Sequence, residues 1–351
     1  MTAAAEAASP GTGTVPGPEQ ATRRGSDFTA LLQTARARGL LRPRRLRYAA
    51  SLAVDLAVYV GVWVVVWLLG ETWWALFLAV PAALFTTRLA FFGHDVSHRQ
   101  VARTARMNNV LAWCMGDLVT GFSSRWWADK HAKHHGNPNL VGEDPDVDPG
   151  ALIWTKEQAG ARRGGRFGVW TARYQAELLF PLLLLEAINL RVTGLQAVRR
   201  PRELVLQVTH LIVYLGGLLL VLGPGRAAVF IAIHQALVGL HLGVAFVPGH
   251  TGMPMPPTNS RWDFLRKQVL TTRNVRGGAA THWFMGGLNH QIEHHLFPSM
   301  PRSNLRSAGA LVRAHCAEVG VPYASDSLKE SMVLAMRYLR EVGTPHDSPD
   351  P

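Results

Sequence analysis

The chain has 351 residues, of which 48% are hydrophobic and only 17% are charged, and its formal net charge is +12. Soluble domains usually carry about 25% charged residues, and here the apolar residues stand in long blocks separated by arginine-rich stretches, so the composition argues against a large soluble core and indicates a polytopic membrane protein. Nucleic-acid binding is disfavoured as the reason for the positive charge, because basic loops beside apolar spans are what membrane topology requires.

The first 26 residues are rich in Ala, Gly, Pro and Thr and contain no apolar core of a signal peptide. We therefore expect residues 1–26 to form a disordered tail and expect no cleavable signal. Cys114 and Cys316 are too few and too far apart to predict a disulfide framework or a CxxC metal site.

Four segments are long and apolar enough to cross a bilayer, which requires about 20 residues each. They lie at about residues 48–70, 73–92, 204–223 and 227–247. The connections GETW and GPGR are so short that the four segments must form two hairpins. Two further apolar stretches, 110–122 and 178–190, are interpreted as interfacial or re-entrant helices. The predicted fold is therefore an all-α integral membrane protein with four transmembrane helices.

Positive charge predicts the orientation of these spans. Six arginines closely precede the first span, namely Arg36, Arg38, Arg42, Arg44, Arg45 and Arg47, and many Lys and Arg residues lie between the second and third spans. Arg226 is the only basic residue in the two short turns. By the positive-inside rule both termini and the long central loop face the cytoplasm. After about residue 302 the chain is polar, and residues 321–351 are expected to form a C-terminal cytoplasmic extension.

Three histidine clusters are the most informative feature of the chain. They are His94 and His98 in HDVSH, His131, His134 and His135 in HAKHH, and His290, His294 and His295, with Gln291, in HQIEHH. A helix brings residues three and four apart onto one face, and imidazole is a ligand of iron, zinc, copper and nickel. The predicted topology places all three clusters on one side of the membrane.

The number of histidines exceeds what one zinc ion needs, since a zinc site takes about four ligands. Two metal ions that share the set fit better. Redox-active iron is the favoured occupant, because neutral nitrogen ligands suit iron and leave positions open for dioxygen.

In this order and with these intervening spans, HDVSH, HAKHH and HQIEHH resemble the three histidine boxes of the membrane fatty acid desaturases. The stretches QVLTTRNVRGG and THWFMGGLNHQIEHHLFPSMPRSNL are similar to the acyl-lipid and acyl-CoA branch of that superfamily, and QIEHH resembles its front-end type. The resemblance covers roughly residues 45–320, within an expected membrane domain of residues 27–320.

The resemblance implies a non-haem di-iron centre held by a cytoplasmic helical cap at the ends of four transmembrane helices. Such a centre activates O2 with two externally supplied electrons and removes two hydrogens from adjacent methylenes of an acyl chain, which leaves a cis double bond. The ligands implied by motif position are His94, His98, His131, His134, His135, His294 and His295. His250 in FVPGHTGMP would be a further ligand, and either Gln291 or His290 would complete the third box.

Two departures from the family pattern stand out. Similar sequences usually carry an asparagine directly before the histidine at 250, whereas this chain has Gly249. The chain also has no His-Pro-Gly-Gly segment, so we expect no fused haem-binding domain and expect electrons from a separate donor, such as a ferredoxin with its NAD(P)H-dependent reductase. The fatty acyl substrate would be an acyl-CoA or a membrane lipid.

Several neighbouring residues have two open interpretations. Asp95, Asp129 and Glu293 could accept the second ring N–H of box histidines, or could be solvated or capping residues. His241 could support the metal site or pack structurally. The run Asp144, Asp146 and Asp148 in EDPDVD is predicted to form a polar turn, because Pro145 and Pro149 break its spacing.

The leading hypothesis is an acyl desaturase of the cytoplasmic membrane of a bacterium, a source suggested by the Ala-, Arg- and Gly-rich composition with only five lysines. A di-iron hydroxylase or ketolase acting on a lipid or isoprenoid is the alternative within the same chemistry, although the LNHQIEHHLFP context favours desaturation. A non-catalytic membrane metal-binding protein is the alternative from another class, but histidines gathered on one face do not suit a permeation path.

Overall fold

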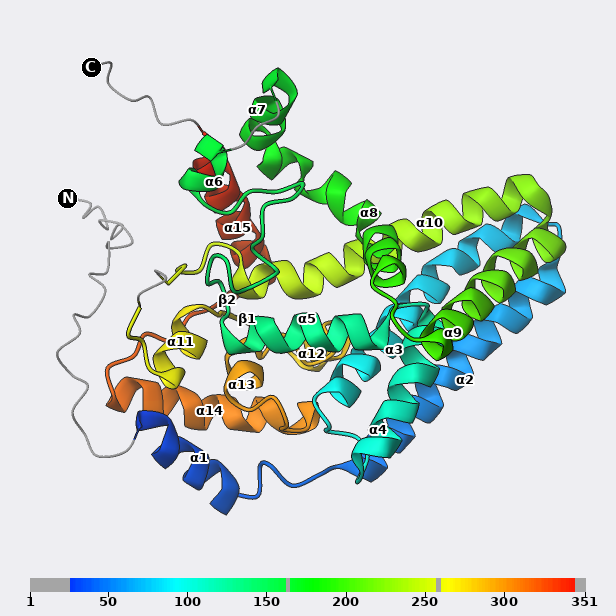
Figure 1. Ribbon diagram of the computed structural model, residues 1–351. Coiled ribbons are helices and arrows are strands. Elements are labelled where there is room, and N and C mark those ends of the chain that lie inside the picture. The colour runs from blue at the N-terminus through cyan, green and yellow to red at the C-terminus, as the bar shows by residue number, and fades with distance from the viewer. Residues whose placement is uncertain (1–25, 162–164, 257–259, 345–351) are drawn as a thin grey trace, which may run out of the picture.

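The computed structural model describes residues 26–161, 165–256 and 260–344. Almost all of its regular structure is helical, as expected. Long apolar helices gather at one end of the molecule, and shorter helices pack at the other end (Figure 1). The expected tail lies almost entirely outside the described residues.

Among the described residues, four helical segments are long and apolar enough to cross a membrane: Arg45–Leu69, Trp73–Ser97, Gln175–Gln196 and Pro201–His250. The first is α2 (Arg45–Leu69), and the second joins the short helix η2 (Trp73–Leu78) to α3 (Ala79–Ser97). Gly70 has φ 52° between them, a left-handed conformation that glycine adopts without a steric penalty. Asp55 of α2 and Arg88 of α3 form a buried ion pair with two N–O distances of 2.9 Å, which fixes the register of the two helices.

The fourth segment is bent back on itself. It comprises α9 (Pro201–Leu211), the π-helical turn η4 (Ile212–Gly216) and α10 (Gly217–His250). Gly223 has φ 71° and ψ 165°, which interrupts the helix. The Tyr214 hydroxyl lies 2.7 Å from Nδ1 of His234, although 20 residues of straight helix would span about 30 Å. The chain therefore reverses at GPGR, where the sequence predicted a turn.

The stretch expected to be a short interfacial helix at 178–190 differs from that expectation. It is part of α8 (Gln175–Gln196), a continuous helix that is itself long and apolar enough to span. α8 crosses α10 in close backbone contact, because a Cβ on Gly239 would lie 2.3 Å from the carbonyl oxygen of Leu183. The absence of side chains at Gly239 and Gly243 allows this approach.

The other short apolar stretch, 110–122, forms the end of α4 (Ala105–Ala112) and a π-helical segment, η3 (Trp113–Thr120). It packs against α3 and α9. The carboxylate of Asp117 is fully buried there and accepts hydrogen bonds from the Ser124 hydroxyl and the Gln207 amide. A charged residue in this apolar stretch is thus accommodated by polar partners from two other segments.

Short helices complete the other end of the molecule. They are α1 (Asp27–Ala37), α5 (Ser124–Gly136), α6 (Lys156–Ala161), α7 (Gly165–Arg173), α11 (Phe264–Leu270), α12 (Ala279–Phe284), α13 (Gln291–Leu296), α14 (Arg302–Glu318) and α15 (Leu328–Gly343). One apolar core joins α1, α11, α13 and α14 through Leu31, Leu265, Ile292 and Leu305. The fold is not purely helical, because β1 (Asn274–Arg276) and β2 (Ser325–Ser327) pair in parallel. The expected extension after residue 320 therefore begins with a strand paired to the site-bearing part of the chain.

Candidate metal centre

Three helices bring the histidine clusters together. His94 and His98 lie at the C-terminal end of α3, one helical turn apart. His131, His134 and His135 lie in the second half of α5, which begins after the N-cap residue Ser123. His294 and His295 lie on α13 and are each only 1% exposed.

Five histidines from these helices form one compact group, within which the nearest ring nitrogens all lie within 4.8 Å of one another; its members are His94, His98, His131, His135 and His294. Nε2 of His131 lies 3.0 Å from Nε2 of His94 and 2.9 Å from Nε2 of His98. Nε2 of His135 lies 3.1 Å from the same atom of His294. The imidazoles therefore point their Nε2 atoms at a common centre.

A second group contains His134, His250 and His295. Nε2 of His134 lies 3.3 Å from Nε2 of His250, which comes from the end of α10. The side-chain amide of Gln291 lies 2.8 Å from the same atom of His250. His290, the other candidate for this position, lies in neither group, and its ring faces that of His282 at 5.5 Å.

Both groups have the chemistry of metal sites. Burial, together with repulsion from neighbouring imidazoles, holds the pKa of His98, His131, His135, His294 and His295 well below the ordinary value. These rings are neutral near pH 7, as metal ligation requires. Nε2 of His295 and Oε1 of Gln291 are buried without a hydrogen-bond partner among the described residues. Buried polar atoms are rarely left unpaired, so these two atoms fit ligation of a metal ion.

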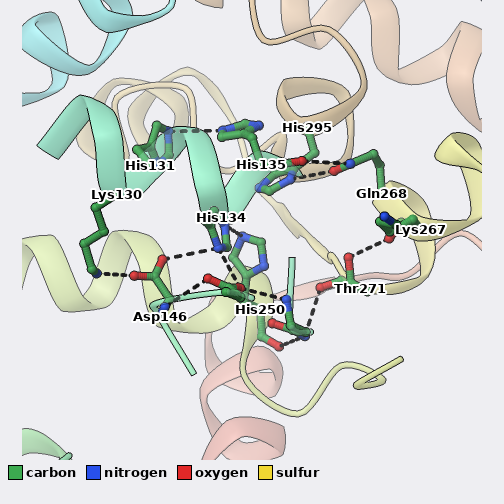
Figure 2. Close-up of polar contacts among 12 residues, drawn as sticks. Lys130, His131, His134, His135, Asp146, His250, Lys267, Gln268, Thr271 and His295 are labelled. Carbon is green, nitrogen blue, oxygen red and sulfur yellow. Dashed lines mark hydrogen bonds and ion pairs between the residues drawn. The ribbon is translucent and has the colours of Figure 1, made fainter. Parts of the chain in front are cut away.

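Side chains outside the groups orient three of the rings through Nδ1. Asp144 lies 2.9 Å from Nδ1 of His134, Gln268 accepts from Nδ1 of His295 at 2.9 Å, and Asp95 lies 3.3 Å from Nδ1 of His94. Figure 2 shows His134 between Asp146 and His250, and Gln268 reaching His295. Such partners fix the tautomer and direction of a ligating imidazole.

The carboxylates also shift one pKa in the opposite direction. Burial alone would lower the pKa of His134, but the carboxylates of Asp146 and Asp144 outweigh it and raise that pKa. The interpretation of EDPDVD as a polar turn alone is therefore incomplete. Asp144 does accept backbone N–H groups, from Asn139 at 2.7 Å and Asp146 at 2.9 Å, but it is fully buried against His134.

The other three suggested supporting residues contact partners outside the two histidine groups. Asp129 does not hold an imidazole, because its carboxylate is 72% exposed and lies 3.8 Å from Arg125. Glu293 is fully buried and accepts hydrogen bonds from Asn274 at 2.7 Å and Tyr323 at 2.8 Å, and its carboxylate lies 3.7 Å from Nδ1 of His290, the box histidine outside both groups. Nε2 of His241 donates a hydrogen bond to the carbonyl oxygen of Phe284 at 2.8 Å, which links α10 to α12.

Sequence reasoning missed Gln268 and the role of Asp144. Gln268 lies in QVLTTRNVRGG, so the signal available was its place in a family-like motif on a short helix. Its amide also donates to the carbonyl oxygen of His135 at 2.9 Å, which links the second and third clusters.

A cavity of about 640 Å³ opens beside both groups. Four of its lining residues are the clustered histidines His94, His131, His134 and His250. Much of the remaining wall is apolar or aromatic and includes Phe122, Trp127, Leu182, Leu183, Leu190 and Phe246. Trp127 stacks on the ring of His131 with centroids 4.9 Å apart, so the same side chain forms the wall and supports a clustered imidazole.

The family model for fatty acid desaturases matches residues 71–327, a range that contains all three histidine clusters. The chain belongs to the fatty acid desaturase family. The acyl-lipid (9-3)-desaturase of Physcomitrium patens is 33% identical over 276 residues, which are 74% of this chain and 52% of that protein.

Two further relatives are more distant. The Delta(6)-fatty-acid desaturase fat-3 of Caenorhabditis elegans is 28% identical over 77% of this chain and 65% of its own length. The Delta(8)-fatty-acid desaturase of Euglena gracilis is 28% identical over 74% of this chain and 66% of its own length. The chain thus spans about half to two thirds of the length of these relatives. They come from eukaryotes and give no support to the expected bacterial source.

Proposed function

We propose that this member of the family is an O2-dependent, non-haem di-iron desaturase that introduces a cis double bond into a long fatty acyl chain. The observation that carries the proposal is the shared position of His94, His131, His134 and His250, which belong both to the two histidine groups and to the wall of the 640 Å³ cavity. A methylene chain in that cavity would lie directly beside bound metal.

The proposed ligands divide as the geometry suggests. His94, His98, His131, His135 and His294 would hold one iron ion, and His134, His250 and His295 with Gln291 would hold the other. Bound iron would supply activation of dioxygen with two electrons and removal of hydrogen from a methylene carbon.

The side chains of the protein position the substrate and exclude water. The apolar wall favours an extended hydrocarbon and removes it from solvent. Trp127 stacks on His131, which lines the same cavity, and makes an edge contact with Phe246 at 5.9 Å, so it supports both the wall and the imidazole. Lys130 and Arg200 also line the cavity and could bind the charged head of an acyl carrier, either coenzyme A or a lipid.

We propose that α2 with η2–α3, and the two arms of Pro201–His250, cross the membrane as two hairpins beneath a cytoplasmic helical cap. The meeting of His135 with His294 at 3.1 Å supports this arrangement. If α8 crossed the membrane in addition to the two arms that follow it, these residues would be in opposite compartments. Both termini would then be cytoplasmic, and the arginine-rich, lysine-poor composition supports a bacterial cytoplasmic membrane.

The proposed electron donor is a separate ferredoxin with an NAD(P)H-dependent reductase. The net charge of +12 supports an acidic partner, because opposite charge steers association.

The test is expression of the full chain with this donor system, followed by gas chromatography and mass spectrometry of the cellular fatty acids. We expect a new cis-unsaturated acid, abolished by His294→Asn and retained by His290→Asn, a matched change at a histidine outside both groups. A hydroxylated, saturated product would replace the proposal with a hydroxylase. If iron-loaded protein with a working donor yields no oxidised lipid, both the desaturase and the hydroxylase hypotheses are contradicted, and a non-catalytic metal-binding protein is favoured.

A further inference from the structure

A second cavity, of about 200 Å³, lies at the beginning of α2 and shares no lining residue with the acyl cavity. Four segments distant in sequence form it: α2, α3, α12 and the start of α14. Its lining includes Arg47, Ser51, Arg88, Trp283, Arg302 and Ser303. Three guanidinium groups around so small a space repel one another unless counter-charges, solvent or an anionic ligand offset them.

Carboxylates of the protein neutralise only two of the three guanidinium groups. Arg88 pairs with Asp55 at 2.9 Å, and Arg302 pairs with Asp95 at 3.0 Å. Arg47 forms no ion pair with any described residue and is exposed. The cavity therefore has an excess of positive charge.

One donor on a residue of this lining also lacks an acceptor. Nη2 of Arg302 is buried and has no hydrogen-bond partner among the described residues. A buried donor without an acceptor is unfavourable, and the hydroxyl group of Ser51 in the same lining is a further potential donor, whereas that of Ser303 donates to Asn304 at 3.4 Å. An anion with several acceptor oxygens would satisfy these groups together.

The surroundings of the cavity indicate where such an anion would come from. Leu46, next to Arg47, is 87% exposed, and Trp283 is 42% exposed. Arg44 and Arg45 directly precede Leu46 at the start of a candidate membrane span. Exposed apolar and aromatic side chains mixed with arginine are typical of the level of lipid headgroups.

We propose that this cavity binds a phosphate group, supplied by the headgroup of an anionic phospholipid. Phosphate matches the donor set, because arginine binds its oxygens with two parallel N–H groups and the Ser51 hydroxyl adds a further bond. The site is distinct from the acyl cavity, and it is joined to the metal centre by Arg302, since Asp95 lies between Arg302 and His94.

The experiment uses the full iron-loaded protein in an uncharged detergent and measures binding by calorimetry. The probes are dihexanoylphosphatidylglycerol, dihexanoylglycerol with the same chains and no phosphate, and inorganic phosphate. The variants are Arg47→Gln and Ser303→Glu in the lining, with Arg45→Gln as the matched control on the same helix turn, outside the lining.

We expect the phospholipid to bind and dihexanoylglycerol not to bind. Arg47→Gln should raise the Kd roughly tenfold, the value of one hydrogen bond to a charged group, and Ser303→Glu should raise it further by repulsion, while Arg45→Gln has little effect. The same pattern with inorganic phosphate alone would support the phosphate site and assign free phosphate as its source. Equal binding of the phospholipid by all variants, or no binding of either phosphate probe, would overturn the proposal.

Discussion

Gly249 lies directly against Gln291: a Cβ on Gly249 would be 3.1 Å from Cγ of Gln291. The amide of Gln291 in turn lies 2.8 Å from Nε2 of His250. The glycine that departs from the family pattern therefore makes room for the glutamine at the head of the third box. These two residues act as a pair in the second histidine group.

Substitution of Gly249 should weaken that group selectively. Gly249→Ala would push Gln291 away from His250, and overpacking of this kind costs about 1–3 kcal/mol. We expect iron content to fall from two ions toward one per chain, as measured by elemental analysis of purified protein. Gly61→Ala is the control, because a Cβ there has no neighbour within 4 Å. An unchanged iron content in Gly249→Ala would contradict the pairing.

Loss of Gln268 should reduce metal affinity beyond its effect on stability. Gln268→Ala removes the acceptor for His295 and the donor to the carbonyl oxygen of His135, and loss of such supporting bonds typically lowers metal affinity 10- to 100-fold. Gln175→Ala is a matched control, because Gln175 is equally buried and its side-chain amide likewise makes two hydrogen bonds, in its case to the backbone of Ile153 and Leu339. Iron titration should show a lower iron affinity for Gln268→Ala than for Gln175→Ala, even where the two melting temperatures fall by the same amount. Equal iron affinities of the two variants would count against the role of Gln268.

The metal-free protein should lose stability as the pH falls below about 6.5, the ordinary histidine pKa. Burial lowers the pKa of His131, His135 and His294 in the folded state. Between the folded and unfolded pKa values the unfolded chain binds more protons, so acid favours unfolding. Thermal unfolding of chelated protein from pH 7.5 to 5 should show this loss, and iron loading should move it to lower pH because metal competes with protons. A flat profile of the chelated form would contradict the assignment of these rings as neutral.

The contact between α8 and α10 should limit the size of residue tolerated at Gly239. Its Cβ would lie 2.3 Å from the carbonyl oxygen of Leu183, a backbone atom that cannot rotate away. We expect Gly239→Ala to destabilise the protein by about 1–3 kcal/mol. Because Leu183 lines the acyl cavity, the variant should also alter the chain-length distribution of any unsaturated products. Gly217→Ala, on the same helix with open space around it, should do neither.

Local sequence patterns were sufficient to predict the parts of the site that are local. His94 and His98, or His131 and His135, are one turn apart on a helix, so their shared face follows from spacing alone. The turn at GPGR was predictable because Gly223 adopts a conformation that glycine favours. His250 was found only through the family resemblance, since a single histidine after a span has no periodic partner.

Contacts between distant segments could not be predicted in this way. Gln268 reaches His295 across 27 residues, and Asp129, although adjacent to a box, points to solvent. The choice between Gln291 and His290 depended on the side-chain direction at the start of α13, which spacing does not determine. The extent of α8 was underestimated because Pro181 and Glu186 weaken its apolar pattern, whereas its packing on α10 supports a longer helix.

Because β1 pairs with β2, the part of the chain that supports the metal centre extends beyond residue 320. Asn274, at the start of β1, and Tyr323, just before β2, both donate to the carboxylate of Glu293, the neighbour of His294. A truncation or a fusion joint placed at 320 would remove one of these donors and leave a buried acid only half satisfied. Shortened versions would therefore lose metal before they lose their membrane helices.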